Sequence, residues 1–289
     1  MSRILAVLVT IGMVAGAIYI RDRIDDDGGG GGGGNGGAQL VCDPVLEAAC
    51  RAVSGDVVVE DAATTAERVI GADSFEGDGW VTAGPWPAMV DELRETAGRT
   101  PLFGDGGRVV ASSRMAVVGP AETPGPWRAV GDAVGGSDLR LGWRDPASGL
   151  GVLQVGAFAV GFFDGPDFAT NDFDAAFRSY LEGIEDEAEV ARNPLERRLQ
   201  QGVSFAAAVV SFQAEAERLL EEAAPGRRGD LQPLYPDPVV AVEAVLAGTE
   251  DGAGDLRESL NEQGWDVPAD RSGLPSPGVL AALWQEVRR

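Results

Sequence analysis

Short apolar runs alternate with segments of helical periodicity along most of the chain. The first three such runs after residue 38 are rich in β-branched residues, aromatic residues or both, and an amphipathic segment follows each of them. Parallel strands need a crossover of a dozen or more residues, which a helix supplies. The alternation therefore predicts an α/β fold built on parallel sheets. The predicted strands lie at 39–42, 56–60 and 79–83, and the predicted helices at 44–53, 64–70 and 85–96.

The same pattern continues through the rest of the sequence. One segment, 148–163, is apolar enough to suggest a membrane span. It is only about 16 residues long, contains several glycines and Gln154, and lies between βα units, so we interpret it as a buried helix. Further strands are predicted at 108–111, 115–119, 139–143, 205–211 and 231–234, and further helices at 127–134, 173–191, 195–201, 213–223, 255–263 and 277–288.

The N-terminal segment differs from this body. Residues 4–20 form an apolar run, interrupted by Thr10, that is close to the minimum length of a bilayer span. Residues 1–22 are expected to be a signal anchor with a transmembrane helix, or a signal peptide cleaved at its Ala-Gly-Ala sequence. Residues 23–38 hold seven consecutive glycines and predict a flexible, acidic linker. Both interpretations place the body outside the cytoplasmic membrane, tethered in the first case and secreted in the second.

Charge and the absence of histidine exclude several functions. The net charge is −23 and the pI is about 4.2, so the surface repels phosphate backbones and a nucleic-acid partner is not expected. The chain has no histidine, which removes the commonest general base, the Ser-His-Asp and Cys-His arrangements and most zinc and copper sites. We therefore expect no enzyme, no cofactor and no metal site.

The chain contains two cysteines, Cys42 and Cys50. An even pair in an exported chain is typical of a disulfide, whose short loop stabilises by about 2–3 kcal/mol. Two buried free thiols are the main alternative. A metal site is the weakest interpretation, because no further soft ligands lie near the pair.

Several short segments follow the predicted strands in a characteristic order. They are Cys42-Asp43-Pro44, Ala62-Ala63-Thr64-Thr65, residues 79–83 before Pro85-Trp86, residues 108–120, Asp145-Pro146-Ala147-Ser148-Gly149 and Leu234-Tyr235-Pro236. In this order they resemble the type II periplasmic binding proteins, the molybdate- and sulfate-type substrate-binding proteins of ABC transporters. The resemblance covers nearly all of residues 39–289.

The resemblance implies two Rossmann-like α/β lobes joined by two crossing strands, with a ligand cleft between them. We expect residues 39–110 and 232–289 to form the first lobe and residues 111–231 the second. The expected function is capture of a small polar solute by a tethered extracytoplasmic protein, with an ABC permease or another membrane protein as partner. The alternative is a degenerate binding fold that acts as a membrane-tethered protein-interaction module.

Candidate ligand-binding residues lie where predicted strands end. Ligands of open α/β sheets bind there, because the following helix N-termini present unpaired N–H groups. The candidates are Asp43, Thr64, Thr65, Thr82, Ser112, Arg114 and Ser148.

Each candidate also has a structural interpretation. Asp43, Ser148 and either Thr64 or Thr65 are candidates for helix caps, and Arg114 and Arg144 are candidates for surface ion pairs. In the anion-binding members of the family a serine usually occupies the position of Asp43, and a carboxylate there repels an oxyanion. The mixed charges of Asp43 and Arg114 indicate a zwitterionic or polar neutral ligand instead.

Overall fold

The computed structural model describes residues 39–249, 252–265 and 273–289, which lie in one compact unit, residues 37–289. The expected signal anchor or signal peptide (1–22) and the linker (23–38) lie outside the described residues. Within the described ranges, no helix combines the length and the apolar character needed to cross a membrane.

The first half of the sheet combines parallel and antiparallel strands. Its order is β2-β1-β3-β9-β4, with β1 parallel to β2 and β3, and β9 antiparallel to both β3 and β4. The parallel part was predicted from the alternating pattern, whereas β9 was not predicted. These strands are β1 (Leu40–Cys42), β2 (Val57–Val59), β3 (Gly79–Ala83), β4 (Arg108–Gly119) and β9 (Ala241–Ala247).

The second half of the sheet starts from the same strand β4. β4 pairs antiparallel with β7 and β8, and β5 lies parallel to both β7 and β6. The sequence pattern suggested two strands at 108–111 and 115–119, but residues 112–114 also pair with β9, so the strand is continuous. The remaining strands are β5 (Leu141–Trp143), β6 (Glu189–Val190), β7 (Ala208–Phe212) and β8 (Gln232–Leu234).

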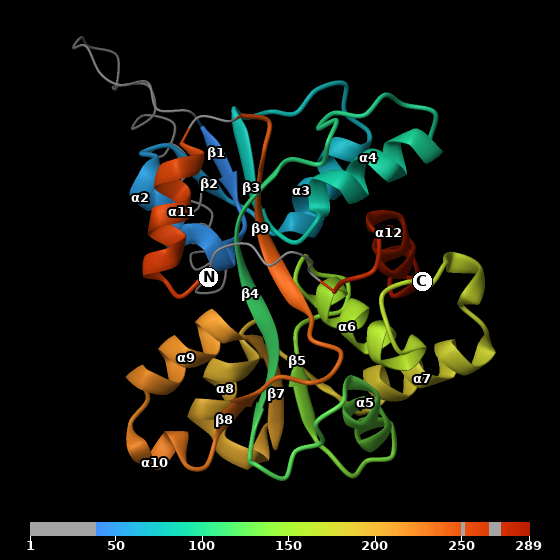
Figure 1. The fold of residues 1–289 in the computed structure, drawn as a ribbon, viewed down its shortest axis with the longest axis vertical. Coiled ribbons are helices and arrows are strands. Elements are labelled where there is room, and N and C mark those ends of the chain that lie inside the picture. The colour runs from blue at the N-terminus through green and yellow to red at the C-terminus, as the bar shows by residue number, and fades with distance from the viewer. Residues whose placement is uncertain (1–38, 250–251, 266–272) are drawn as a thin grey trace, which may run out of the picture. The chain divides into compact units, whose positions relative to one another are not determined.

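β4 and β9 connect the two halves. In Figure 1 both strands run through the middle, with β1, β2 and β3 toward one end and β5, β7 and β8 toward the other. β8 pairs with residues 117–119 at the C-terminal end of β4. The next strand, β9, then carries the chain back to the first half of the sheet. The lobe boundaries at 110/111 and 231/232 stay a prediction.

Helices cover both halves of the sheet. α2 contacts α11, α3 contacts α4, and α5 contacts α6 and α7, while α12 contacts both α4 and α6. The helices are η1 (Pro44–Leu46), α2 (Glu47–Val53), α3 (Ala62–Ile70), α4 (Trp86–Thr96), α5 (Trp127–Gly135), α6 (Gly151–Phe163), η2 (Thr170–Asp172), α7 (Ala175–Glu187), α8 (Pro194–Gln201), η3 (Gly202–Ser204), α9 (Gln213–Glu222), α10 (Pro225–Arg228), α11 (Ala253–Glu262) and α12 (Pro277–Glu286).

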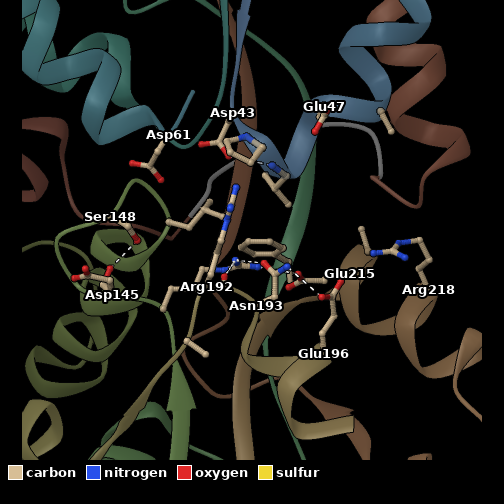
Figure 2. A pocket seen from close by; sticks show the side chains of 18 of the residues that line it. Asp43, Glu47, Asp61, Asp145, Ser148, Arg192, Asn193, Glu196, Glu215 and Arg218 are labelled. Carbon is tan, nitrogen blue, oxygen red and sulfur yellow. Dashed lines mark hydrogen bonds and ion pairs between the residues drawn. The ribbon is translucent and has the colours of Figure 1, made fainter. Parts of the chain in front are cut away.

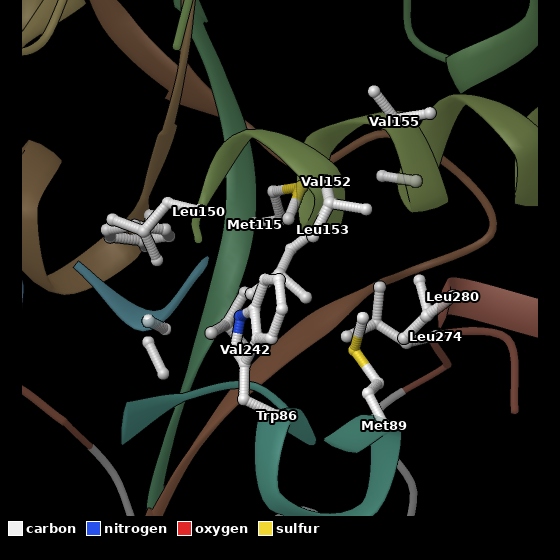
Figure 3. Packing of buried hydrophobic residues seen from close by; sticks show 14 of the residues in the cluster. Trp86, Met89, Met115, Leu150, Val152, Leu153, Val155, Val242, Leu274 and Leu280 are labelled. Carbon is white, nitrogen blue, oxygen red and sulfur yellow. The ribbon is translucent and has the colours of Figure 1, made fainter. Parts of the chain in front are cut away.

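The larger hydrophobic core is continuous across the two halves. It includes side chains of α4, β4, β9, α6 and α12 that pack together (Figure 3). α6 is buried along most of its 13 residues, which confirms the interpretation of 148–163 as a buried helix. Gly84, at a φ of +90°, has no room for a side chain, because a Cβ there would lie 2.7 Å from Leu153 Cδ1. The two halves are therefore in close contact where the end of β3 meets α6.

Candidate functional site

A pocket of about 1190 Å³ is lined by residues of both halves. It is lined by the end of β1, η1 and α2, by the start of α3, by the β5–α6 turn, by the segment from β6 into α8, and by the start of α9. Figure 2 shows Asp43, Glu47 and Asp61 on the side formed by the first half, and Ser148, Asn193 and Glu215 on the opposite side. The pocket thus lies among strand ends and helix starts, as open α/β sheets favour.

Asp43 lies at the carboxyl end of β1 and caps η1. Its Oδ1 accepts a hydrogen bond from the Val45 N–H at 3.2 Å, and its own N–H donates to the Val81 carbonyl at 2.9 Å. The side chain is almost fully buried, and Oδ2 has no hydrogen-bond partner. Burial, aided by the charge of Asp61 and opposed by the Val45 N–H and the Arg144 charge, raises the pKa of Asp43 to about 7.

Asp61 caps α3 and also reaches the other half of the fold. Its Oδ1 accepts hydrogen bonds from the Ala63 N–H at 3.0 Å and from the Gly149 N–H at 2.9 Å. The sequence-based assignment of Thr64 or Thr65 as the cap was wrong, because α3 starts two residues earlier, at Ala62. The aspartate just before the helix is a usual capping residue.

The Thr64 and Thr65 side chains lie away from the pocket lining. Thr64 is exposed within the first turn of α3. Thr65 is buried, and its hydroxyl donates to Glu60 Oε2 at 2.6 Å. Both therefore occupy positions inside the helix, and their role as ligand-binding residues stays a prediction without support from the pocket geometry.

Ser148 lines the pocket. Its hydroxyl donates to the Asp145 carbonyl at 2.6 Å and accepts the Gly151 N–H at 3.1 Å. These two bonds hold the β5–α6 turn against the start of α6. The N-cap residue of α6 is Leu150, so the interpretation of Ser148 as the helix cap was wrong, although its hydroxyl accepts the N–H of the first helical residue.

Thr82, Ser112 and Arg114 do not line the pocket. Thr82 is buried within β3, one residue before the strand ends. On β4, the side chain between the two candidates is Ser113, whose Oγ accepts the N–H of Ala214 at the start of α9. Because side chains alternate along a strand, Ser112 and Arg114 face the opposite side of the sheet. Arg114 is exposed and lies over the ring of Tyr235, 5.8 Å from its centroid.

Arg144 and Glu215 form a buried ion pair in the pocket wall. Arg144 Nη2 lies 2.8 Å from Glu215 Oε1, and both side chains are largely shielded from solvent. Glu215 also accepts a hydrogen bond from the Ser211 hydroxyl at 2.6 Å. The interpretation of Arg144 as part of a surface ion pair was thus wrong about its exposure.

Arg144 makes further contacts that fix its position. Its Nη1 donates to the Arg192 carbonyl and to Asn193 Oδ1, and its guanidinium lies 5.6 Å from the centre of the Phe212 ring. The backbone N–H of Arg144 donates to Gln154 Oε1 at 2.9 Å. This arginine therefore acts mainly as a structural cation that joins β5, the start of α8 and α9.

The Cys42–Cys50 disulfide is confirmed, with a Cα–Cα distance of 6.5 Å. It links the end of β1 to α2, immediately before Asp43. The bond therefore holds together two of the elements that form the pocket wall.

Charges of both signs line the pocket. The carboxylates are Asp43, Glu47, Asp61, Asp145, Glu196 and Glu215, and the arginines are Arg51, Arg144, Arg192, Arg197 and Arg218. Arg51 pairs with Glu47 at 2.7 Å and Arg218 with Glu222 at 3.2 Å. Among residues 39–249, 252–265 and 273–289, no group of three or more carboxylate or cysteine side chains is arranged to hold a metal ion.

Sequence reasoning missed Asp61, Arg192 and Glu215 as pocket residues. Asp61 carried a signal, since an aspartate before an alanine-rich helical segment is a usual N-cap. The contact between Arg144 and Glu215 joins residues 71 positions apart in the sequence. Neither that pairing nor the place of Arg192 in the pocket has a local pattern that reveals it.

Comparisons with known proteins identify the fold. No family model matches the sequence, and no curated protein matches it either. The iron-bound protein HitA from Pseudomonas aeruginosa is similar in structure, with a TM-score of 0.54 and 13% sequence identity over 86% of this chain and 98% of that chain.

Two further structures give slightly lower scores. The sulfate-binding protein SubI from Mycobacterium tuberculosis H37Rv has a TM-score of 0.49 and 16% identity, over 86% of this chain and 85% of that chain. A periplasmic thiamin binding protein has a TM-score of 0.49 and 13% identity, over 87% of this chain and 96% of that chain. The molybdate- and sulfate-type assignment stays a prediction, and the described part of the chain has the mixed α/β fold of the periplasmic binding proteins.

Proposed function

We propose that this chain is a solute-binding protein that captures a small polar organic ligand in the pocket beside Asp43. The observation that carries the proposal is the Oδ2 atom of Asp43, which is buried in the pocket wall without a hydrogen-bond partner. An unpaired buried polar atom costs free energy in the empty protein. A ligand that supplies the missing partner recovers that free energy on binding.

The fold supports binding rather than catalysis. The solved structures with which the chain shares its architecture are solute-binding proteins, in agreement with the expectation that the chain is not an enzyme. HitA is described as iron-bound, whereas among the described residues of this chain no three or more cysteine, aspartate or glutamate side chains form a group that could hold a metal ion. These observations favour an organic solute.

A thermal-shift screen of small polar metabolites tests the proposal. A ligand present at about 100 times its Kd stabilises the native state by about 2.7 kcal/mol. We expect at least one compound to raise the unfolding temperature in a concentration-dependent way.

Two variants on α2 give the control. Ala48 is exposed and lines the pocket, whereas Ala52 is exposed on the same helix outside it. Ala48→Trp fills part of the pocket and is expected to weaken binding of the same compound, while Ala52→Trp leaves it unchanged. If no compound stabilises the wild-type protein, the solute-binding proposal is wrong and a protein-docking role explains the fold better.

The proposed setting is the outer side of a membrane, with an ABC permease as partner. Its support is the sequence of residues 1–38, namely the apolar run and the glycine linker. Protease added to intact cells is expected to digest the body. Digestion that requires lysis contradicts this part of the proposal.

A further inference from the structure

Two carboxylates face the same part of the pocket. Asp43 follows β1 and Asp61 precedes α3, and Figure 2 shows both side chains on the side of the pocket formed by the first half. Burial, and after it the charge of Asp61, raises the pKa of Asp43. Two like charges at one site disfavour the ionised form of each other, whereas a nearby cation favours it.

The free oxygen atoms of the pair are available to a ligand. Asp43 Oδ1 is occupied by the Val45 N–H, and Asp61 Oδ1 by the N–H groups of Ala63 and Gly149. Asp43 Oδ2 has no partner although the residue is only 1% exposed. None of the hydrogen bonds among described residues uses Asp61 Oδ2. Each carboxylate thus has one oxygen fixed by the backbone and one left over.

Among the described residues, no arginine forms an ion pair or a hydrogen bond with Asp43 or Asp61. Arg51 is paired with Glu47, and Arg144 is held by Glu215 and by the Arg192 carbonyl. The charge of Arg144 favours ionised Asp43, but the two side chains share no hydrogen bond or ion pair. Arg51 and Arg144 are therefore paired with other residues, and the charge of Arg144 offsets that of Asp43 only in part.

We propose that the ligand carries a protonated amine, which binds at the free oxygens of Asp43 and Asp61. This inference rests on the proposed solute-binding function and specifies the class of solute. An ammonium group offers three N–H donors and one positive charge, so it satisfies the buried Asp43 Oδ2 and reduces the repulsion between the carboxylates. Among the described residues, no group of three or more carboxylate or cysteine side chains is arranged to hold a metal ion, and an anion is repelled by both carboxylates.

The same pocket also holds an arginine without an ion-pair partner among the described residues. Arg192 is exposed there and forms no ion pair with any described residue. A ligand with a carboxylate at some distance from its amine is therefore tolerated, which makes both diamines and amino acids suitable probes.

The test compares four classes of probe that share a carbon chain and differ in charge. α,ω-Diamines, ω-amino acids, dicarboxylates and diols of matched lengths are titrated at physiological salt, where nonspecific attraction of cations to the acidic surface is screened. Calorimetry and thermal shift measure binding. We expect the diamines or the ω-amino acids to bind, and the dicarboxylates and diols not to bind.

Asp43→Asn removes the charge and keeps an acceptor for the Val45 N–H. It is expected to weaken amine binding about tenfold or more, because the lost hydrogen bond is to a charged group. Asp138→Asn is the matched control, since Asp138 is exposed after α5, lies outside the pocket, and has no side-chain partner among the described residues. That variant changes the net charge equally and should bind the amine as the wild type does.

The possible outcomes separate this inference from the proposed function. Amine binding that is equal in Asp43→Asn and wild type overturns the inference. Stabilisation of the wild type only by dicarboxylates, diols or other non-amine metabolites also overturns it, and leaves solute capture standing. Absence of any stabilising compound in the wider metabolite screen overturns both.

Discussion

Asp61 Oδ1 lies 2.9 Å from the backbone nitrogen of Gly149 and so links the start of α3 to the turn before α6. The Gly149 carbonyl accepts a second bond across the same contact, from the Trp86 indole N–H at 2.9 Å. The indole of Trp284 donates to the neighbouring Ala147 carbonyl at 3.0 Å. Side chains of the first half and of α12 therefore hold a turn of the second half beside the pocket.

Asp61→Ala is expected to destabilise the fold by about 1–3 kcal/mol. The substitution removes a helix cap and leaves the partly buried Gly149 N–H without its acceptor. Asp61→Asn keeps an oxygen acceptor, so its free energy of unfolding should fall much less. Urea unfolding of both variants measures the difference, with Asp138→Ala as an exposed control. Equal losses in the alanine and asparagine variants would contradict the assigned hydrogen bonds.

Asp43 makes stability depend on pH. Its pKa of about 7 in the folded protein exceeds the ordinary value of 3.8, so the folded state binds more protons between these values. The stabilising contribution is complete at low pH and is lost as pH rises through about 7. Between about pH 4 and about pH 8, we expect the free energy of unfolding of the wild type to fall by a few kcal/mol relative to that of Asp43→Asn. The expected size follows from about 1.4 kcal/mol per unit of pKa shift.

Comparison with the variant isolates Asp43 from other titrating groups. Burial also raises the pKa of Glu243 and Glu185, so the wild-type curve alone does not identify the residue. Unfolding free energies are measured for wild type and Asp43→Asn across the same pH series. A constant difference between the two proteins would show that Asp43 does not titrate in this range.

Removal of Glu215 from the buried ion pair should cost about 3 kcal/mol or more. Glu215→Gln leaves Arg144 charged in a wall that is largely shielded from solvent. The matched control is Glu222→Gln, because Glu222 pairs with Arg218 on the exposed face of α9 and its loss should cost less than about 1 kcal/mol. Chemical denaturation measures both, and similar losses would argue against the burial of the Arg144 pair.

Loss of the disulfide should lower stability by about 2–3 kcal/mol. The Cys42–Cys50 bond closes a short loop, so the main expected effect is on the entropy of the unfolded chain. A Cys42→Ser/Cys50→Ser variant and the chemically reduced wild type should lose similar amounts in denaturant unfolding. Thiol labelling of both cysteines in the native, unreduced protein would show that the bond is absent.

Local sequence patterns predicted most of the helices and the parallel strands. The run at 79–83 matches β3 (Gly79–Ala83), and the apolar segment at 148–163 contains the buried helix α6. These elements have periodicities that reflect which face is buried, and that information lies in neighbouring residues. β9 was missed because residues 241–247 are apolar except for Glu243 and lack a distinctive period, as expected for a strand at the centre of a sheet.

The sequence by itself determined the α/β class, the paired cysteines and the position of Asp43 at a strand end. It did not determine which polar side chains share the pocket. Thr82 and Ser112 lie near predicted strand ends in the sequence, yet neither lines the pocket, while Asp61 and Glu215 do. Only the tertiary structure decides this, because the contacts of Asp61 with Gly149 and of Glu215 with Arg144 join distant segments, and their energies depend on distances that no local pattern encodes.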